Sequence, residues 1–223
     1  MGIQIVWIVV TAAIAYLLGS ISFAVIVSNA FAHKDVREVG SGNAGMTNVL
    51  RSFGKLPALL TLVGDFSKGI ISVLLGRLIF EHLAGLDPLY GAYLAGLFAI
   101  IGHIYPLFFG FKGGKGVMTT AGMALVIDPR VFIIVIAIFL LLVLITRMVS
   151  VGSIIAAICY PITTYVVYTL MGRPAGVSTV LTACIAALLV YMHRSNIKRI
   201  LNGTESKFER KKRVIHKAGR RLG

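Results

Sequence analysis

The chain of 223 residues is too apolar for a soluble protein: 57% of its residues are hydrophobic, only 13% are charged, and the mean hydropathy is +0.90. Soluble domains carry about 25% charged residues. The first 32 residues contain no Asp, Glu, Lys, Arg or His, and this stretch is longer than the roughly 20 apolar residues that cross a bilayer. These features exclude a soluble globular domain and predict an all-α polytopic membrane protein.

Seven apolar segments are expected to cross the membrane as helices. They are Ile3–Phe31, Leu56–Phe80, Leu89–Phe111, Val117–Ile127, Val131–Thr146, Ser153–Met171 and Val177–Met192. The first is too long, and lacks the preceding positive charge, for a cleavable signal peptide. The fourth is short, because eleven residues rise only about 16 Å against a hydrocarbon core of about 30 Å. It can still cross if it is buried in protein or if the bilayer thins.

The basic residues orient these spans. With the N-terminus outside, the inside segments hold 18 Lys and Arg residues, of which 11 lie between Arg194 and Gly223, and the outside segments hold 3. If residues 117–146 formed one span, the basic tail would fall outside. Because cytoplasmic loops carry the excess of Lys and Arg, we expect seven transmembrane helices and a cytoplasmic C-terminus.

Of the net charge of +14, +9 lies between Arg194 and Gly223, where there are 11 basic and 2 acidic residues. A basic segment behind a membrane helix is typical of contact with the anionic leaflet. We therefore expect membrane lipid as a partner, no nucleic acid and no obligate protein partner. The expected organisation is a membrane domain of residues 1–205 and a basic cytoplasmic tail of residues 206–223.

The first inside loop is rich in glycine and polar side chains. Gly40, Gly42 and Gly45 follow the pattern G-x-G-x-x-G, but no strand–helix unit surrounds it, as a dinucleotide site requires. Glycines permit turns whose backbone N–H groups cradle an anion. Hydrogen-bonding side chains accompany them, at Ser41, Asn43, Thr47, Asn48 and Arg51. The loop is a candidate phosphate site, with a flexible polar connector as the alternative.

The second inside loop superficially resembles a nucleotide-binding P-loop. The segment Gly110-x-x-x-Gly114-Lys115 is one residue short, and Gly116 occupies the Ser/Thr position, so we exclude a P-loop. Its glycines and lysines still predict a phosphate-binding nest, with the residues Lys112, Gly113, Gly114, Lys115 and Gly116. Alternatively, Lys112 and Lys115 only mark the cytoplasmic side of the membrane and bind no ligand.

The remaining ionisable residues allow more than one interpretation. His103 lies in an apolar run, which is typical of a packed histidine, although catalysis is an alternative. His193 ends the last span beside Asn196 and is a candidate base or hydrogen-bond donor. Asp65 and Lys68 are spaced to neutralise each other within a span.

His82-x-x-x-x-Asp87 matches a signature of another large acyltransferase group. It lies in an outside loop, away from the basic loops, so we interpret it as a chance match.

Three regions resemble the bacterial acyl-phosphate:glycerol-3-phosphate acyltransferase family. Gly40–Arg51 resembles its first motif and Gly102–Val117 its second. The third region is matched by Ser150, Ser153, His193, Asn196, Arg199, Gly203 and Glu205. The resemblance runs from Gly19 to about Glu205, which is nearly the whole chain.

This resemblance implies a multi-pass enzyme of the bacterial cytoplasmic (inner) membrane, with its active site facing the cytosol. It implies transfer of a fatty acyl group from acyl phosphate to the 1-hydroxyl of glycerol 3-phosphate. The products are lysophosphatidic acid and inorganic phosphate, and the reaction begins phospholipid synthesis. Neither acyl-CoA nor acyl carrier protein is implied as the direct donor.

Acyl phosphate is an activated mixed anhydride, so we expect direct attack by the hydroxyl without an acyl-enzyme. The proton goes either to the donor's own phosphate or to His193. The rival is Ser41 as a nucleophile, although its motif offers no adjacent base. The residues expected to take part in catalysis are Ser41, Asn43, Ser153, His193 and Asn196. Supporting roles are expected for His103, Ser150, Arg199 and Glu205.

No metal or cofactor is expected, because carboxylates near the inside face are few and Glu205 is expected to pair with a basic neighbour. The competing class is a small transporter of a phosphorylated or anionic solute. Against it, the polar groups gather at one face, whereas a transporter needs access from both sides.

Overall fold

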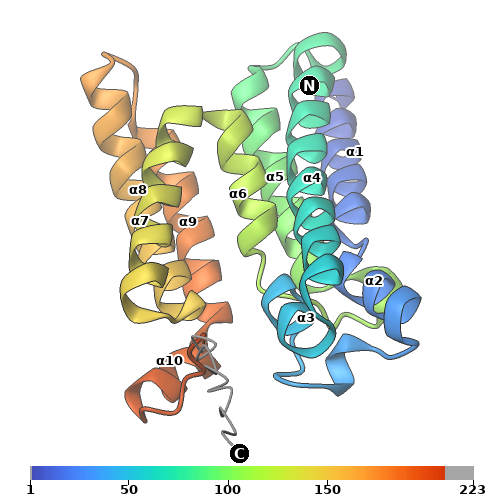
Figure 1. Cartoon of the computed structure of the whole chain (residues 1–223). Coiled ribbons are helices and arrows are strands. Elements are labelled where there is room, and N and C mark those ends of the chain that lie inside the picture. Colours follow the sequence, from blue (N-terminus) through green and yellow to red (C-terminus); the bar gives the residue numbers. More distant parts are fainter. Residues whose placement is uncertain (1, 209–223) are drawn as a thin grey trace, which may run out of the picture.

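The computed structural model describes residues 2–208, and these fold into helices joined by short loops (Figure 1). Long helices are α1 (Gly2–Gly19), α4 (Lys55–Ile79), α5 (Pro88–Ile104), α7 (Pro129–Thr146) and α8 (Val149–Leu170). Five helical stretches are long and apolar enough to cross a membrane. A sixth is counted if α9 (Gly176–Met192) and α10 (Arg194–Leu201), which bend by 58° at their junction, form one span. The chain is therefore an all-helical polytopic membrane protein.

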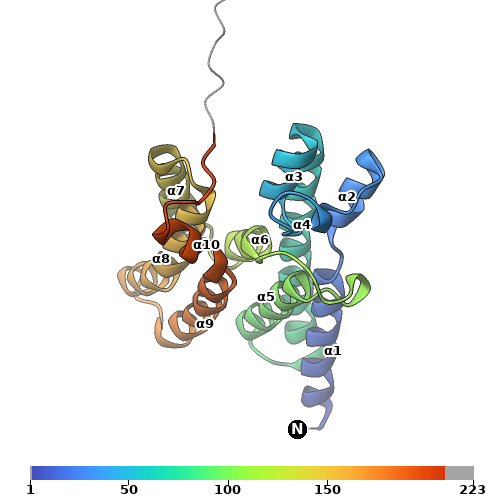
Figure 2. The same ribbon diagram turned by 90° about the horizontal axis from the view of Figure 1, so that it is seen from below.

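Two groups of helices make up the bundle. The helices α1, α4, α5 and the short α6 (Val117–Ile127) pack together, and α7, α8 and α9 form the second group (Figures 1 and 2). One buried cluster joins the groups, since Ile100 and Met123 pack with Leu189 of α9. Glycine brings α4 and α6 into backbone contact, because a Cβ at Gly69 would lie 2.2 Å from the carbonyl oxygen of Thr119. Small residues at such crossings are typical of helices packed in lipid.

The first apolar segment is two helices, not the single helix predicted over Ile3–Phe31. The structure ends α1 at Gly19 and begins α2 (Phe23–Ala32) after a short break. The break leaves backbone groups without helical partners. The Lys68 ammonium donates to the carbonyl oxygen of Ile21 at 2.8 Å, and the Ser20 hydroxyl donates to that of Tyr16 at 2.8 Å. Lys68 of α4, together with Ser20 in the break itself, thus stabilises an interruption that the hydropathy pattern does not reveal.

The separation of α6 from α7 agrees with the two separate segments expected at Val117–Ile127 and Val131–Thr146. Asp128 is the N-cap of α7, and its carboxylate accepts from the backbone N–H of Arg130 at 3.0 Å. Pro129 occupies the first turn, where its missing N–H is not needed.

The short elements gather at the end of the bundle opposite the N-terminus (Figure 1). They include α2, α3 (Met46–Phe53), α10 and the 3-10 turns η1 (Val36–Glu38) and η3 (Leu107–Phe109). The π-turn η2 (Phe80–Ala84) follows α4. Beyond α10, the backbone N–H of Phe208 donates to the carbonyl oxygen of Arg147 at 2.9 Å, so the first residues of the expected tail contact the membrane domain. The rest of that tail, residues 209–223, lies outside the described residues.

Candidate active site

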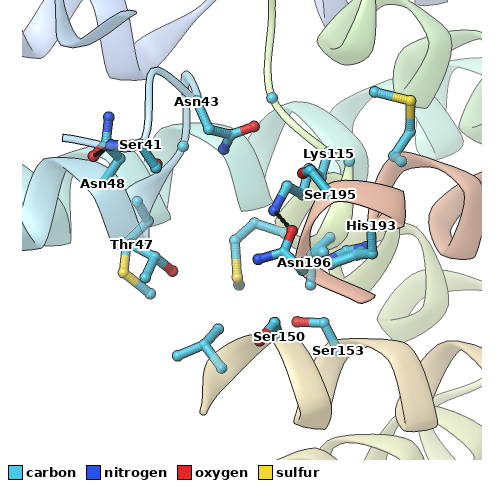
Figure 3. A pocket seen from close by; sticks show the side chains of 18 of the residues that line it. Ser41, Asn43, Thr47, Asn48, Lys115, Ser150, Ser153, His193, Ser195 and Asn196 are labelled. Carbon is cyan, nitrogen blue, oxygen red and sulfur yellow. Dashed lines mark hydrogen bonds between the residues drawn. The ribbon is translucent and has the colours of Figure 1, made fainter. Parts of the chain in front are cut away.

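A pocket of about 360 Å³ opens where the loops meet, at the end that holds α3 and α10. Segments far apart in the sequence line it, and Figure 3 shows their side chains around a common space. Most of the site residues predicted from the sequence line this pocket. They are Ser41, Gly42, Asn43, Gly45, Thr47, Asn48, Arg51, His103, Gly113, Gly114, Lys115, Gly116, Ser150, Ser153, His193, Asn196, Arg199 and Glu205. The two remaining candidates, Gly40 and Lys112, are not among the lining residues, and Lys112 is exposed.

Four helices begin at this pocket. The first residues of α3, α6, α8 and α10 line it, namely Met46, Thr47, Val117, Met118, Val149, Ser150, Arg194 and Ser195. None of these four helices has a side-chain cap; their N-caps are Gly45, Gly116, Met148 and His193. By contrast, Asp87 and Asp128 cap α5 and α7. Uncapped N–H groups and the helix dipole favour anions, so the pocket attracts negative charge from four directions.

The first loop is shaped by the side chain of Asn48, which is 2% exposed. Its amide donates to the carbonyl oxygens of Val36 and Val39 at 2.9 and 3.0 Å, and its oxygen accepts from the N–H of Ser41 at 3.0 Å. These bonds indicate that Asn48 positions the loop. Gly40 has a φ of 59°, and a Cβ there would lie 2.3 Å from the Asn48 oxygen. Gly40 is therefore needed for the turn although it does not line the pocket.

The second loop is held against His103. The N–H groups of Gly113 and Gly114 donate to the carbonyl oxygens of Ile104 and His103, both at 3.1 Å. These two N–H groups are therefore engaged within the chain, unlike those of an open nest. A Cβ at Gly114 would lie 2.2 Å from His103 Nε2 and 2.5 Å from the carbonyl oxygen of Ala44. Glycine thus lets the two loops meet directly above His103.

Of the two lysines of the second loop, Lys115 lines the pocket, and it belongs to a polar chain across it. Its ammonium donates to the amide oxygen of Asn196, whose nitrogen donates to Glu205 at 2.7 Å. Arg199 Nε donates to the other Glu205 oxygen at 2.7 Å. Burial, together with the nearby charge of Arg199, lowers the pKa of Lys115 to about 8. The ammonium is therefore charged at neutral pH but is easily neutralised.

Glu205 is paired with a basic neighbour, as the sequence predicted. Burial raises the pKa of its carboxyl, but hydrogen bonds that include those from Asn196 and Arg199 outweigh burial and keep the pKa below its ordinary value. Glu205 is thus an anion that orients two polar side chains of the pocket.

His193 follows the last residue of α9 and is 3% exposed. Its Nδ1 lies 2.7 Å from the carbonyl oxygen of Leu189. Burial lowers the pKa of His193 to about 4, so the imidazole is neutral at physiological pH. A neutral ring that donates from Nδ1 carries its lone pair on Nε2. His193 is therefore a hydrogen-bond acceptor and a weak base.

Several hydroxyl and amide groups face the same space. Ser41, Asn43 and Thr47 lie on one side, and Ser150 and Ser153 of α8 lie on another (Figure 3). Ser150 is 6% exposed, and its hydroxyl lies beside the Glu205 carboxylate, where it helps to lower the pKa of Glu205. These groups can orient a bound polar molecule.

The base of the pocket is charged. Asp65 and Lys68 form the ion pair that their spacing predicts, at 2.9 Å, and His103 Nδ1 lies 3.4 Å from the same Asp65 oxygen. All three side chains are buried, and Asp65 and His103 line the pocket. The sequence pattern indicated simple neutralisation of Asp65 and gave no sign that the pair approaches the second loop.

Other lining residues were also not predicted. Ser195 is one, and its position between His193 and Asn196 could have indicated it. Arg194 is another, at the start of α10, and the remainder are apolar residues that look like ordinary membrane residues in the sequence: Met46, Val117, Met118, Phe139, Val149 and Met192. Neither His82 nor Asp87 lines the pocket. Across residues 2–208, no group of three His, Cys, Asp or Glu side chains is arranged to hold a metal ion.

The sequence of the chain is similar to those of known acyltransferases. Residues 9–203 match the family model of glycerol-3-phosphate acyltransferase. The glycerol-3-phosphate acyltransferase of Clostridioides difficile is 42% identical over 204 residues, covering 92% of this chain and 97% of that protein. The enzyme of that name from Bordetella pertussis is 43% identical over 205 residues, covering 89% and 91%.

Solved structures give the same result. The glycerol 3-phosphate form of PlsY (YgiH), an integral membrane glycerol 3-phosphate acyltransferase, superposes with a TM-score of 0.77 and 36% identity, covering 91% of this chain and 96% of that one. Its lysophosphatidic acid form gives a TM-score of 0.74 and 35% identity, covering 91% and 95%. The chain therefore belongs to the glycerol-3-phosphate acyltransferase family.

Proposed function

We propose that this chain transfers a fatty acyl group from acyl phosphate to the 1-hydroxyl of glycerol 3-phosphate, giving lysophosphatidic acid and inorganic phosphate. One observation carries the proposal: a single pocket combines four uncapped helix N-termini with Lys115 and Arg51. Both substrates carry phosphate, and such a pocket binds two phosphates without a metal ion. The relatives that bear this activity in their names, and the solved forms with glycerol 3-phosphate and lysophosphatidic acid, support the same substrate and product.

The acyl chain is proposed to leave the pocket along its apolar wall. Met118, Phe139, Val149 and Met192 supply that wall beside the polar groups. Flexible Met side chains suit an aliphatic chain, because they fill irregular space. The phosphates would then bind at the helix N-termini while the chain lies against side chains of α6, α7, α8 and α9.

The reaction is proposed to be a direct attack. The glycerol 3-phosphate hydroxyl oxygen bonds to the acyl carbon, the bond from that carbon to the phosphate oxygen breaks, and the hydroxyl proton goes to the departing phosphate. His193, with a pKa of about 4, is too weak a base to be the favoured acceptor, so it orients the hydroxyl through Nε2. Ser41 and Asn43 in the first loop, and Ser153 and Asn196, orient the substrates.

Ser41 is not proposed as a nucleophile. A serine nucleophile needs a base within hydrogen-bond reach. Within residues 2–208, the hydrogen bond that Ser41 makes comes from its backbone N–H and goes to the side-chain oxygen of Asn48. An acylated Ser41 peptide recovered during turnover would overturn the direct-attack mechanism.

The membrane arrangement is also a proposal. We infer seven spans, with α6 short and α9 crossing to the bend at His193, the N-terminus outside, and the pocket facing the cytosol across the bacterial inner membrane. The excess of Lys and Arg at the pocket end supports this orientation. Cysteine introduced at Lys112 should be protected from an impermeant thiol reagent in intact cells, whereas cysteine at Leu86 should react. The reverse pattern would refute the orientation.

The activity is tested with protein purified in detergent. Labelled glycerol 3-phosphate is supplied with palmitoyl phosphate, palmitoyl-CoA or palmitoyl acyl carrier protein, and lysophosphatidic acid is measured. Product from acyl phosphate alone is expected, and its rate of formation should be strongly reduced in Arg51→Ala and Lys115→Ala. A transporter needs a sealed membrane, so folded protein that forms no product from any donor would refute the enzyme and favour a transporter.

A further inference from the structure

Arg37 lies outside the lining of the pocket but connects its two glycine-rich loops. Its Nη1 donates to the backbone carbonyl oxygens of Phe109, at 2.5 Å, and Lys112, at 3.2 Å. Both acceptors belong to the second loop, which leads directly to Lys115. Arg37 itself belongs to η1, which leads directly into the first loop.

The guanidinium is fixed on its other side by Asp35. Nε donates to both carboxylate oxygens of Asp35 at 3.0 Å, and Nη2 donates to one of them at 2.7 Å. The hydrogen bond from Arg37 holds the pKa of Asp35 below its ordinary value, so the carboxylate is charged at neutral pH. The planar fork of arginine can serve both sides at once, whereas a lysine ammonium cannot reproduce this geometry.

The backbone that carries Arg37 is anchored as well. Val36, which is fully buried, donates its N–H to Ser28 of α2 at 3.1 Å, and its carbonyl oxygen accepts from Asn48 of α3 at 2.9 Å. Asn48 in turn holds Ser41. A continuous set of bonds therefore runs from Ser41 through Asn48 and η1 to Arg37, and from Arg37 to the second loop.

We propose that Arg37 is a positioning residue that sets the spacing of the two phosphate-binding loops, so that Lys115 faces the groups of the first loop. This inference rests on the function proposed above. Arg37 touches backbone atoms and Asp35, not the space inside the pocket, so it acts through Lys115. Displacement of a catalytic group by about 1 Å can lower the rate about 100-fold.

The test compares Arg37→Lys and Arg37→Met with wild type for acyl transfer from palmitoyl phosphate. We expect kcat/KM to fall about tenfold to 100-fold in both variants, with little change in Tm. The matched control is Arg173→Lys, because Arg173 also pairs with an aspartate, Asp128, at 3.3 Å, and does not line the pocket. Equal kcat/KM in wild type and both Arg37 variants would overturn the proposal.

A double-mutant cycle separates positioning from general destabilisation. If Arg37 acts through Lys115, Arg37→Lys should have little effect in a Lys115→Met background. Full additivity of the two substitutions would overturn the proposal. Binding of inorganic phosphate to wild type and to Arg37→Lys is measured in parallel. If wild type proves inactive with acyl phosphate, weaker phosphate binding by Arg37→Lys than by wild type still supports the inference. If wild type is inactive and the two proteins bind phosphate equally, the inference is refuted. Failure of the proposed function is thereby distinguished from failure of this role of Arg37.

Discussion

Replacement of Lys115 by methionine removes one charge from the pocket and nearly preserves the length of the side chain. Lys115 lies among Asn196, Glu205 and the start of α6, where it can contact a phosphate oxygen. Hydrogen bonds to charged groups contribute about 1.5–3 kcal/mol. Since about 1.36 kcal/mol corresponds to a tenfold change in rate, we expect kcat/KM of Lys115→Met to fall about tenfold to 150-fold.

The assay is steady-state formation of lysophosphatidic acid in detergent, with each substrate varied in turn. Lys112→Met is the matched comparison, because Lys112 belongs to the same loop but is exposed and does not line the pocket. The effect of Lys112→Met should be much smaller. Equal losses in the two variants would mean that the loop contributes only general positive charge, and unchanged kinetics in Lys115→Met would refute its role in phosphate binding.

Four further results are expected. Because the pKa of Lys115 is about 8, KM for glycerol 3-phosphate should rise in wild type as the pH is raised through that value. This rise should disappear in Lys115→Arg, because arginine stays charged. Identical pH profiles for the two proteins would contradict a role of the Lys115 charge in substrate binding. Glu205→Gln removes an anion that raises the pKa of Lys115, so the rise in KM should begin at lower pH, and an unshifted profile would argue against the coupling. Gly114→Ala should lower kcat/KM up to about 100-fold, because the added Cβ meets His103 and Ala44. Gly176→Ala should match wild type, because a Cβ at Gly176 has open space. Similar kinetics for both variants would refute the tight contact of Gly114 with His103 and Ala44. Asn48→Ala leaves the buried carbonyl group of Val36 unpaired, at about 1–3 kcal/mol, and removes the bonds to Val39 and Ser41, so hydrogen exchange should accelerate in the first loop. Unchanged protection would contradict the positioning role of Asn48.

The helical class and the gathering of polar loops could be predicted from composition and charge, because both depend on local properties of the chain. The break at Ser20–Ser22 could not, since it contains neither Gly nor Pro and is stabilised by Lys68 from a different helix. The separation of α6 from α7 was predictable for the opposite reason: Asp128 and Pro129 are local signals for a helix start.

The sequence predicted which residues make up the candidate site better than it predicted what each of them does. Sequence motifs identified Lys115 and Asn196, but not that they contact each other. Asn48 was expected to bind phosphate, and the structure shows its side chain bonded to the loop itself. Asp65 was expected only to neutralise Lys68, and Arg37 was given no role in the site, because their other partners, His103 and the second loop, are distant in the sequence. Such roles depend on tertiary contacts, which spacing in one sequence does not reveal.

The convergence of four helix starts on one pocket has a consequence for inhibition. Part of the positive field comes from peptide groups, which every residue except proline supplies at a helix start. A substitution of one side chain therefore leaves that part of the field in place. An inhibitor whose anionic group binds these backbone amides would leave the protein few single-residue routes to resistance, whereas one that relies on the Lys115 side chain could be evaded by one change.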